Sequence, residues 1–388
     1  MLAVACLTLL VAGVSRTGAQ AQFSFDYPAI ATQLVRQLAP QAGEKILILA
    51  HPGYFEDLIP HLRYAIARAG ATDVGVVDVL AEPVPQGWDV EEIRRGNVRA
   101  RQAYRDMFAG VDGAIMMPGA TPAHPAYAAL QDQLRAGHGR TVHFHWVENG
   151  SAYPLPGQPL PARAAIDAMY QRALLQTDYP ALAKVLESLE RALRAGEVRV
   201  TSPAGTDLRF RIGDRTVNLQ NGDASAARAA RGKVLIDREI ELPAGVARVA
   251  PLENSVEGTI AFPPSQWDGQ PVEGLRLHFS KGQVDRIEAT SGREAVEREM
   301  SANGDAGKRF REFALGVNPL LAVPDRNPWI PYYGYGAGVV RLSLGDNSEL
   351  GGAVGGGYVR WNFFTDLTVS IDGQPWVTNG RLSVPSEK

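Results

Sequence analysis

The chain has 388 residues, of which 45% are hydrophobic and 21% charged, so it can bury a substantial core, and its length favours two domains over one. Its formal net charge is only -3 at pH 7, and short basic runs such as Arg94-Arg95 lie among acidic residues. This balance gives no general attraction to phosphate backbones or anionic membranes, and we expect no nucleic acid as a partner.

Residues 1–21 have the pattern of a signal peptide. The apolar run Leu2–Val14 has the length of a signal-peptide core, and Ala19-Gln20-Ala21 supplies the small residues that a signal peptidase requires. We therefore expect an exported protein, periplasmic or secreted, that loses Cys6, its only cysteine, on cleavage. No Lys or Arg precedes the run, which leaves a misplaced start codon or a merely apolar tail as alternatives. No later stretch is predicted to span a membrane.

Residues 22–153 alternate between short apolar runs and segments with helical periodicity. Short buried strands separated by helices predict a doubly wound parallel sheet, and thus an α/β domain. The expected strands are 45–50, 73–79, 113–117 and 141–146, and the expected helices are 59–68, 90–109 and 126–136.

The composition changes after residue 153. The proline-rich segment 154–161 can continue neither a helix nor a strand, and we expect it to form a hinge. With a long amphipathic helix over 162–195, interrupted at Pro180, it makes up a linker of residues 154–195. Short strands and glycine turns then predict a mainly antiparallel, Gly-rich α+β domain over 196–388. One helix is expected within it at 293–300, with Phe313 as its furthest extent.

Several histidines fall at the carboxyl ends of the predicted parallel strands, where ligands bind in such sheets. His143 and His145 lie two apart on one strand, a spacing that zinc or iron can use. No third ligand is evident, so hydrogen-bonded strand-end histidines are the favoured interpretation. A metal site that involves His51, His124 and His145 is the alternative.

The familiar short motifs do not supply a function. The runs GYGAGVV and GGAVGGG lack the Lys-Ser/Thr of a phosphate loop and do not link a first strand to a helix, which favours turn and bulge glycines. G-x-S-x-G and H-E-x-x-H are both absent, which removes the simplest hydrolase and zinc-protease readings.

From residue 199 onward the chain resembles the metallo-aminopeptidases of the aminopeptidase T and aminopeptidase S type, to which the iron-dependent dihydroxypyridine dioxygenases are distantly similar. The order and spacing of the segments agree with that family, which implies its fold and a homodimer. The matching segments are TSPAGTDLRFRIGDR (201–215), ELPAGVARVAPLENSVEGTI (241–260), EGLRLHFSKGQVDRIEA (273–289), REFALGVNP (311–319), GVVRLSLGDN (338–347) and VRWNFFTDL (359–367).

The resemblance implies a two-metal site, but most ligand positions are substituted. Family members use a Glu after a P-x-G turn, a Glu in a GEFALG-like segment, a His in a GTVHIALG-like segment, and a His and an Asp in an HWD-like segment. The corresponding residues here are Val246, Glu312, Arg341, Arg360 and Asn362. Because a guanidinium stays protonated and has no lone pair to offer, we expect no metal and no other cofactor at this site.

Three functions follow from this substituted site. In the first, the chain is a degenerate family member that binds a carboxylate-bearing small molecule or a peptide terminus without a metal. Two guanidiniums form a fork for the carboxylate, and Glu312 holds an amine or one of the arginines. We assign Arg341, Arg360, Asn362 and Val246 to ligand binding, and Glu312 is the candidate catalytic residue.

In the second, the chain remains an active metallo-aminopeptidase, because the alignment is shifted by a turn or because other carboxylates and a histidine rebuild the site. The carboxylates considered are Glu253, Glu257, Asp346 and Asp366. In the third, Glu312 and the two arginines form an internal ion cluster in a structural or interaction protein. Tyr332, Tyr333 and Tyr335 either line a ligand-facing loop or, as we favour, pack over the domain junction.

Overall fold

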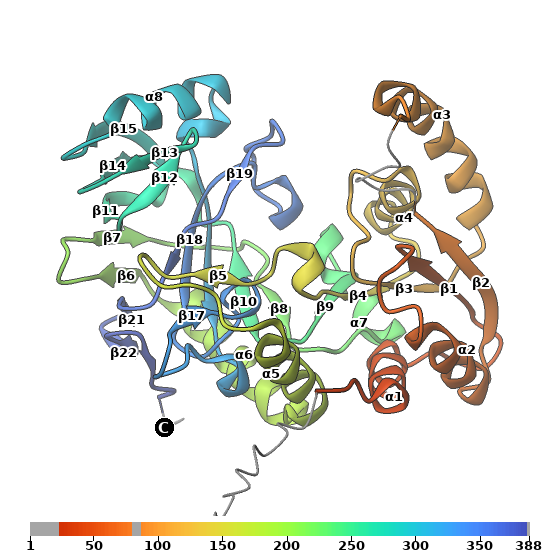
Figure 1. The fold of residues 1–388 in the computed structure, drawn as a ribbon. Coiled ribbons are helices and arrows are strands. Elements are labelled where there is room, and N and C mark those ends of the chain that lie inside the picture. The colour runs from red at the N-terminus through yellow and green to blue at the C-terminus, as the bar shows by residue number, and fades with distance from the viewer. Residues whose placement is uncertain (1–22, 80–86, 386–388) are drawn as a thin grey trace, which may run out of the picture.

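The fold is described from a computed structural model, which covers residues 23–79 and 87–385 (Figure 1). The expected signal peptide, with its cleavage site after Ala21 and Cys6, lies outside the described residues. Within them, none of the helices combines the length and the apolar character needed to cross a bilayer.

A parallel sheet with helices on both faces forms the N-terminal lobe (Figure 1). Ile46 and Ile48 pack into one hydrophobic cluster with the first two helices, and Leu47 and Leu49 pack into another with the next two, so the first strand is buried on both faces. The elements are α1 (Tyr27–Leu38), β1 (Lys45–Ala50), α2 (Leu58–Arg68), β2 (Thr72–Asp78), α3 (Val90–Phe108), β3 (Gly113–Met116), α4 (Pro125–Arg135) and β4 (Thr141–Phe144).

Two helices follow the proline-rich segment, where β5 (Tyr153–Pro154) pairs with β17 (Trp329–Ile330). The predicted interruption near Pro180 is confirmed, since α5 (Arg163–Gln176) ends before it and α6 (Tyr179–Ala195) contains it in its first turn. Asp178 caps α6 by accepting a hydrogen bond from the Ala181 amide at 3.0 Å. Proline is tolerated in a first helical turn because its missing N–H would have no partner there.

In the described part of the chain, the C-terminal lobe contains two large antiparallel sheets and the two-stranded sheet β12-β13. One large sheet has the order β19-β18-β16-β10-β8, with β20 also paired to β18, and the other has the order β15-β14-β11-β7-β6-β21-β22-β23. Its elements are β6 (Val198–Thr201), β7 (Asp207–Phe210), β8 (Asn218–Gln220), α7 (Ala226–Ala229), β10 (Val246–Val249), β11 (Glu257–Ala261), β12 (Ser265–Trp267), β13 (Gln270–Val272), β14 (Arg276–Ser280), β15 (Gln283–Glu288), α8 (Arg293–Ala302), β16 (Phe310–Gly316), β18 (Val340–Gly345), β19 (Val359–Arg360), β20 (Phe363–Phe364), β21 (Thr368–Ile371), β22 (Gln374–Thr378) and β23 (Arg381–Leu382).

The predicted fold class is confirmed: a parallel α/β sheet is followed by a mainly antiparallel α+β region. Two helices, α1 and α7, were not predicted, and one predicted helix differs in extent. The helix expected from residue 293 ends at Ala302, and the residues up to Phe313 do not extend it, because β16 is a buried strand paired with both β10 and β18.

A strand from the second half of the chain completes the N-terminal sheet. β9 (Glu239–Leu242) pairs in parallel with β4, so the sheet order is β2-β1-β3-β4-β9. Directly after it, β10 enters the antiparallel sheet of the C-terminal lobe. The two sheets therefore meet where β9 leads into β10, beside the segment that carries Val246.

Candidate functional site

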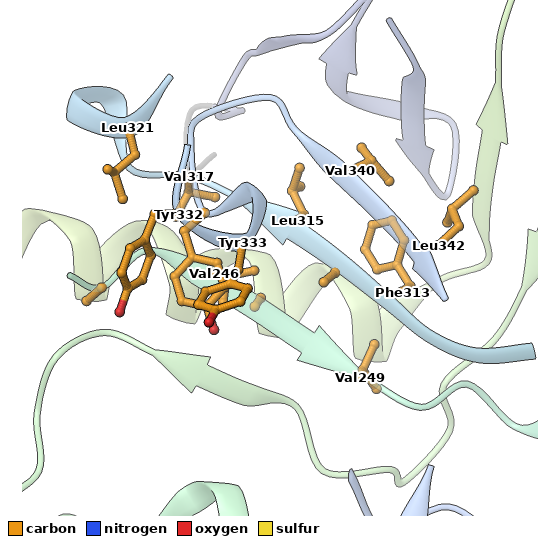
Figure 2. Close-up of a cluster of buried hydrophobic side chains, with 14 of the residues drawn as sticks. Val246, Val249, Phe313, Leu315, Val317, Leu321, Tyr332, Tyr333, Val340 and Leu342 are labelled. Atoms are coloured by element: carbon orange, nitrogen blue, oxygen red, sulfur yellow. The ribbon is translucent and has the colours of Figure 1, made fainter. Parts of the chain in front are cut away.

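The residues of the candidate site lie on one face of the sheet built from β10, β16 and β18. Side chains alternate between the two faces of a strand, so Val249, Phe313 and Leu342 lie on the apolar face (Figure 2). The Phe313 ring packs against Phe210 of the larger sheet, with ring centroids 5.3 Å apart. Arg248, Glu312 and Arg341 therefore share the opposite face.

Glu312 is the centre of an ion cluster on that face. Its side chain is fully buried, and its Oε1 lies 2.6 Å from Arg341 Nε while its Oε2 lies 3.0 Å from Arg248 Nη2. Ser343 donates a further hydrogen bond to Oε1 at 3.3 Å. Burial alone would raise the pKa of Glu312, but Arg248 and Arg341 hold it well below its usual range. The carboxylate is therefore ionised, with both oxygens engaged.

The cluster contains three residues that were not singled out from the sequence: Arg248, Arg311 and Glu349. Glu349, on the short helix η7 (Ser348–Leu350), accepts a hydrogen bond from Arg248 Nη2 at 2.8 Å and another from Arg311. Arg311 Nε also lies 3.8 Å from Glu312 Oε2. Arg248 could have been found from the sequence, because it lies two residues after Val246 in a strand and therefore on the same face. Nothing local in the sequence identifies Glu349.

The structure separates the residues assigned from the sequence. Glu312 and Arg341 are in contact, and Val246 is buried on the same face of β10 as Arg248. Arg360 is elsewhere: its guanidinium donates to Glu299 Oε1 at 2.7 Å, to the Gln266 carbonyl at 2.6 Å and to Asn362 Oδ1 at 3.2 Å. It also stacks over the Trp267 ring at 3.4 Å. The two arginines therefore do not form one fork.

Asn362 forms hydrogen bonds to the backbone of β18. Its side-chain amide donates to the Leu342 carbonyl at 3.0 Å, and its backbone carbonyl accepts from the Leu342 amide at the same distance. It thus joins the segment between β19 and β20 to β18, and its side-chain oxygen positions Arg360.

A second polar group lies where β4 and β9 run side by side. Tyr127 donates to Glu239 Oε1 at 2.6 Å, and His143 Nδ1 lies 3.3 Å from the same oxygen. The His143 and His145 rings overlap, with centroids 3.6 Å apart, and His145 Nε2 lies 3.6 Å from Glu241 Oε1. Burial, together with His143, lowers the pKa of His145 to about 4, so its imidazole is neutral at pH 7.

The two polar groups approach each other at Glu241. Burial alone would raise the pKa of Glu241, but His145 and, to a smaller extent, Arg248 lower it to about 2. The negative charge of Glu241 in turn favours the charged form of Arg341. The His145 ring lies 5.1 Å from that of Tyr333, whose carbonyl accepts from Arg341 Nη1 at 3.2 Å. Residues from β4, β9 and β18 and from the short helix η6 (Tyr332–Gly334) thus surround one region.

Several buried polar atoms in this region have no hydrogen-bond partner among the described residues. Such atoms are rare in native interiors and each calls for an explanation, such as a bound polar group or water. They are Arg341 Nη2, Arg311 Nε, Tyr332 Oη, His143 Nε2, His145 Nδ1 and Glu241 Oε2. Arg341 Nε is also without a hydrogen bond, since its N–H is misaligned in the ion pair with Glu312.

The backbone of η6 is strained where it holds the two tyrosines. Tyr332 and Tyr333 have φ values of 42° and 52°, a left-handed conformation that aromatic residues rarely adopt. Figure 2 shows both rings beside Val246, and all three residues belong to one hydrophobic cluster. Strain of this kind costs about 1–3 kcal/mol per residue and concentrates at binding and catalytic sites. It agrees with a site at this junction.

The metal ions that the resemblance implies do not fit these residues. Both oxygens of Glu312 are held by guanidiniums, so a cation would have to displace one positive group and lie beside another. In residues 23–79 and 87–385, no group of three or more His, Cys, Asp or Glu side chains is arranged to hold a metal ion. This includes His51, His124 and His145, and also the carboxylates that could have rebuilt the site.

We expect divalent metal ions to leave this cluster unaffected. Zinc, cobalt or manganese should not raise the midpoint of thermal unfolding, and a chelator should not lower it, because no ligand set competes with the guanidiniums. Elemental analysis of the purified protein and calorimetric unfolding check this. Stoichiometric metal that is lost in Glu312→Gln but kept in Glu190→Gln, a change on the surface of α6, would contradict it.

The sequence and the fold both match known proteins. Residues 176–320 match the family described as thermophilic metalloprotease (M29). That segment includes Val246 and Glu312 but ends before Arg341 and Arg360. No curated protein sequence matches the chain.

Two solved structures share the fold over nearly the whole length. AmpT from Thermus thermophilus is 17% identical, with a TM-score of 0.56 over 92% of this chain and 99% of that one. The 2,5-dihydroxypyridine dioxygenase from Pseudomonas putida KT2440 is 15% identical, with a TM-score of 0.61 over 92% of this chain and 97% of that one. At these identities the likeness shows the fold alone. Residues 176–320 are thus similar in sequence to the thermophilic metalloprotease (M29) family, and the chain as a whole has an AmpT-like fold.

Proposed function

We propose that this chain binds the free carboxylate of a small molecule or a peptide terminus, without a metal, at the junction of β18, η6, β4 and β9. The observation that supports this most directly is the set of buried polar atoms without partners on Arg341, Tyr332, His145 and Glu241. Donors and acceptors left in this way are costly unless a ligand or ordered water satisfies them.

The charges of the cluster favour an anionic group at Arg341. Three guanidiniums, those of Arg248, Arg311 and Arg341, share the two carboxylates of Glu312 and Glu349. Within the ion cluster one positive charge is left over, and the ionised carboxylate of Glu241 offsets part of it. Arg341 has free donor capacity at Nη2, since its one hydrogen bond goes to the Tyr333 carbonyl. A carboxylate suits a guanidinium because two of its N–H groups can point at two oxygens.

The remaining polar atoms fit the neighbouring parts of such a ligand. The Tyr332 hydroxyl can donate a second hydrogen bond to the carboxylate. Glu241 Oε2 can accept from an ammonium group or from a peptide N–H. In this proposal Glu312 is a positioning residue, because both of its oxygens hold arginines. The ligand class is an α-amino acid or a peptide with a free carboxyl end.

Isothermal titration calorimetry with α-amino acids, short peptides and dicarboxylates tests the proposal. Arg341→Met should weaken binding at least about 30-fold, because a charge-assisted hydrogen bond contributes about 1.5–3 kcal/mol. Tyr332→Phe should weaken it about 10-fold with no loss of thermal stability, because the removed hydroxyl has no partner among the described residues.

Arg140→Met is the matched control, because Arg140 is another buried arginine and lies in the N-terminal lobe, bound to Glu44 at 2.6 Å. It should leave the affinity unchanged. Failure of the unmodified protein to bind any of these ligands would overturn the proposal. So would full affinity in Tyr332→Phe together with Arg341→Met, or a loss confined to Arg360→Gln, which would place the carboxylate at the other arginine.

The other two functions receive less support. No donor set in the described residues favours an active metallo-aminopeptidase. An internal ion cluster is present, but it explains only Glu312 and its arginines and leaves the atoms without partners unexplained. Export and a homodimer are part of the proposal, and they are checked by N-terminal sequencing of the mature protein and by its mass in solution.

A further inference from the structure

A large groove opens on the side of the C-terminal lobe next to this site. Its volume is 1360 Å³, above the range of about 300–1,000 Å³ of most small-molecule sites. Most of its lining comes from three chain segments, within residues 153–159, 261–266 and 359–366. The lining includes the rings of Tyr153, Phe262, Trp361, Phe363 and Phe364, and the prolines Pro154, Pro156, Pro159, Pro263, Pro264 and Pro328.

The groove and the carboxylate site share a wall. Phe363 faces Arg341 across the β18–β20 pair, so the two side chains are neighbours on one face of the sheet. The guanidinium of Arg341 also lies 5.3 Å from the centre of the Trp361 ring. The Tyr153 ring packs against that of Phe363 with centroids 4.4 Å apart, and its centroid lies 6.2 Å from that of Tyr333. Trp361 and Phe363 therefore border both the groove and Arg341.

The chemistry of the groove suits an extended, largely apolar peptide. Aromatic-lined grooves recur where proteins bind peptides in extended conformations. The prolines of this groove supply backbone carbonyl acceptors without N–H donors. The charge of Arg360 is already matched by Glu299, whereas Asp366 is exposed and has no ion-pair partner among the described residues. The groove thus carries one unmatched negative charge at its rim.

From these observations we infer that the groove binds the body of a peptide whose C-terminal carboxylate is held at Arg341. This rests on the proposed function and adds the length and character of the ligand: several residues, apolar near the C-terminus, with a basic residue that complements Asp366. Val359 and Leu155 line the groove away from Arg341 and would contact the peptide, but not a free amino acid.

The experiment compares affinities along a series of ligands that share one C-terminal residue: the free amino acid, the dipeptide, the tetrapeptide and its C-terminal amide. We expect the tetrapeptide to bind at least about 10-fold more tightly than the amino acid. Amidation of its C-terminus should weaken the binding of the tetrapeptide at least about 10-fold. Val359 is 41% exposed, and Val359→Ser should reduce the increase in affinity from the amino acid to the tetrapeptide. It should leave the affinity for the free amino acid unchanged. Asp366→Asn should likewise reduce this increase for tetrapeptides that contain lysine, and not for those that contain glutamate.

The outcomes separate the two proposals. If amino acids bind but added residues bring no gain, or if the gain is untouched by both Val359→Ser and Asp366→Asn, the groove assignment is wrong while the carboxylate site stands. If the tetrapeptide amide binds as tightly as the tetrapeptide with a free carboxylate, Arg341 does not bind the carboxylate and the proposed function fails. If no ligand of the series binds, both fail.

Discussion

Replacing Glu312 by glutamine should lower the free energy of unfolding by about 3–5 kcal/mol, the cost of removing one partner from a buried ion cluster. The side chain is fully buried, and it is the only direct ion-pair partner of Arg341 among the described residues. Glutamine keeps the shape but leaves the guanidinium uncompensated in a medium of low dielectric constant. Chemical denaturation at neutral pH, with the midpoint and slope fitted separately, measures the change.

Glu190→Gln provides the comparison, because Glu190 pairs with Arg194 on the surface of α6 and should change stability by no more than about 0.5 kcal/mol. Adding Arg341→Met to Glu312→Gln should recover part of the loss, since the unpaired charge is then gone. A double variant that is less stable than either single variant would show that Glu312 and Arg341 do not stabilise each other.

Stability should also fall as the pH is lowered from 7 to 5, and His145 should be a main cause. Its pKa is about 4 in the folded protein, because of burial and His143, against 6.5 for an unperturbed histidine. Between these values the unfolded chain binds a proton that the folded one does not, so acid favours unfolding. For one histidine the loss is about 2 kcal/mol by pH 5. His124, whose pKa is also lowered to about 4 by burial and His51, acts in the same direction.

Urea unfolding at several pH values between 7 and 5 checks this, with His145→Gln as the test variant and His138→Gln, at an exposed position, as its control. His145→Gln should reduce the pH dependence of the free energy of unfolding, and His138→Gln should not. Glu241 contributes little in this window, because its pKa is held near 2 and its carboxylate stays ionised. An unchanged slope in His145→Gln would mean that this imidazole is not buried in its neutral form.

The sequence was sufficient for elements whose signal is local. Runs such as KILILA gave the first strand within its observed bounds, and Pro180 placed the break between α5 and α6 because proline acts on its own turn. β16 was harder to predict, since the segment FREFALG contains charged residues whose spacing also suits a helix. Pairing on both sides decides its conformation, and the sequence of one segment does not contain that information.

The site was predictable only in part, for the same reason. Alignment with the family identified Glu312 and Arg341, which lie on adjacent strands. It also suggested that Arg360 would join them, but Glu299, 61 residues away in sequence, binds that guanidinium instead. Glu241 and His145 come from strands of the other sheet, and only the fold brings them near Arg341.

The position of β9 has a consequence for how the protein is made. The N-terminal sheet lacks its last strand until residue 242 has been synthesised, about a hundred residues after β4. Until then Val142 and Phe144, both fully buried in the finished fold, belong to an exposed sheet edge. The first lobe therefore cannot complete its sheet ahead of the second during translation. A chain cut after residue 153 would leave the ribosome with that edge open to other chains.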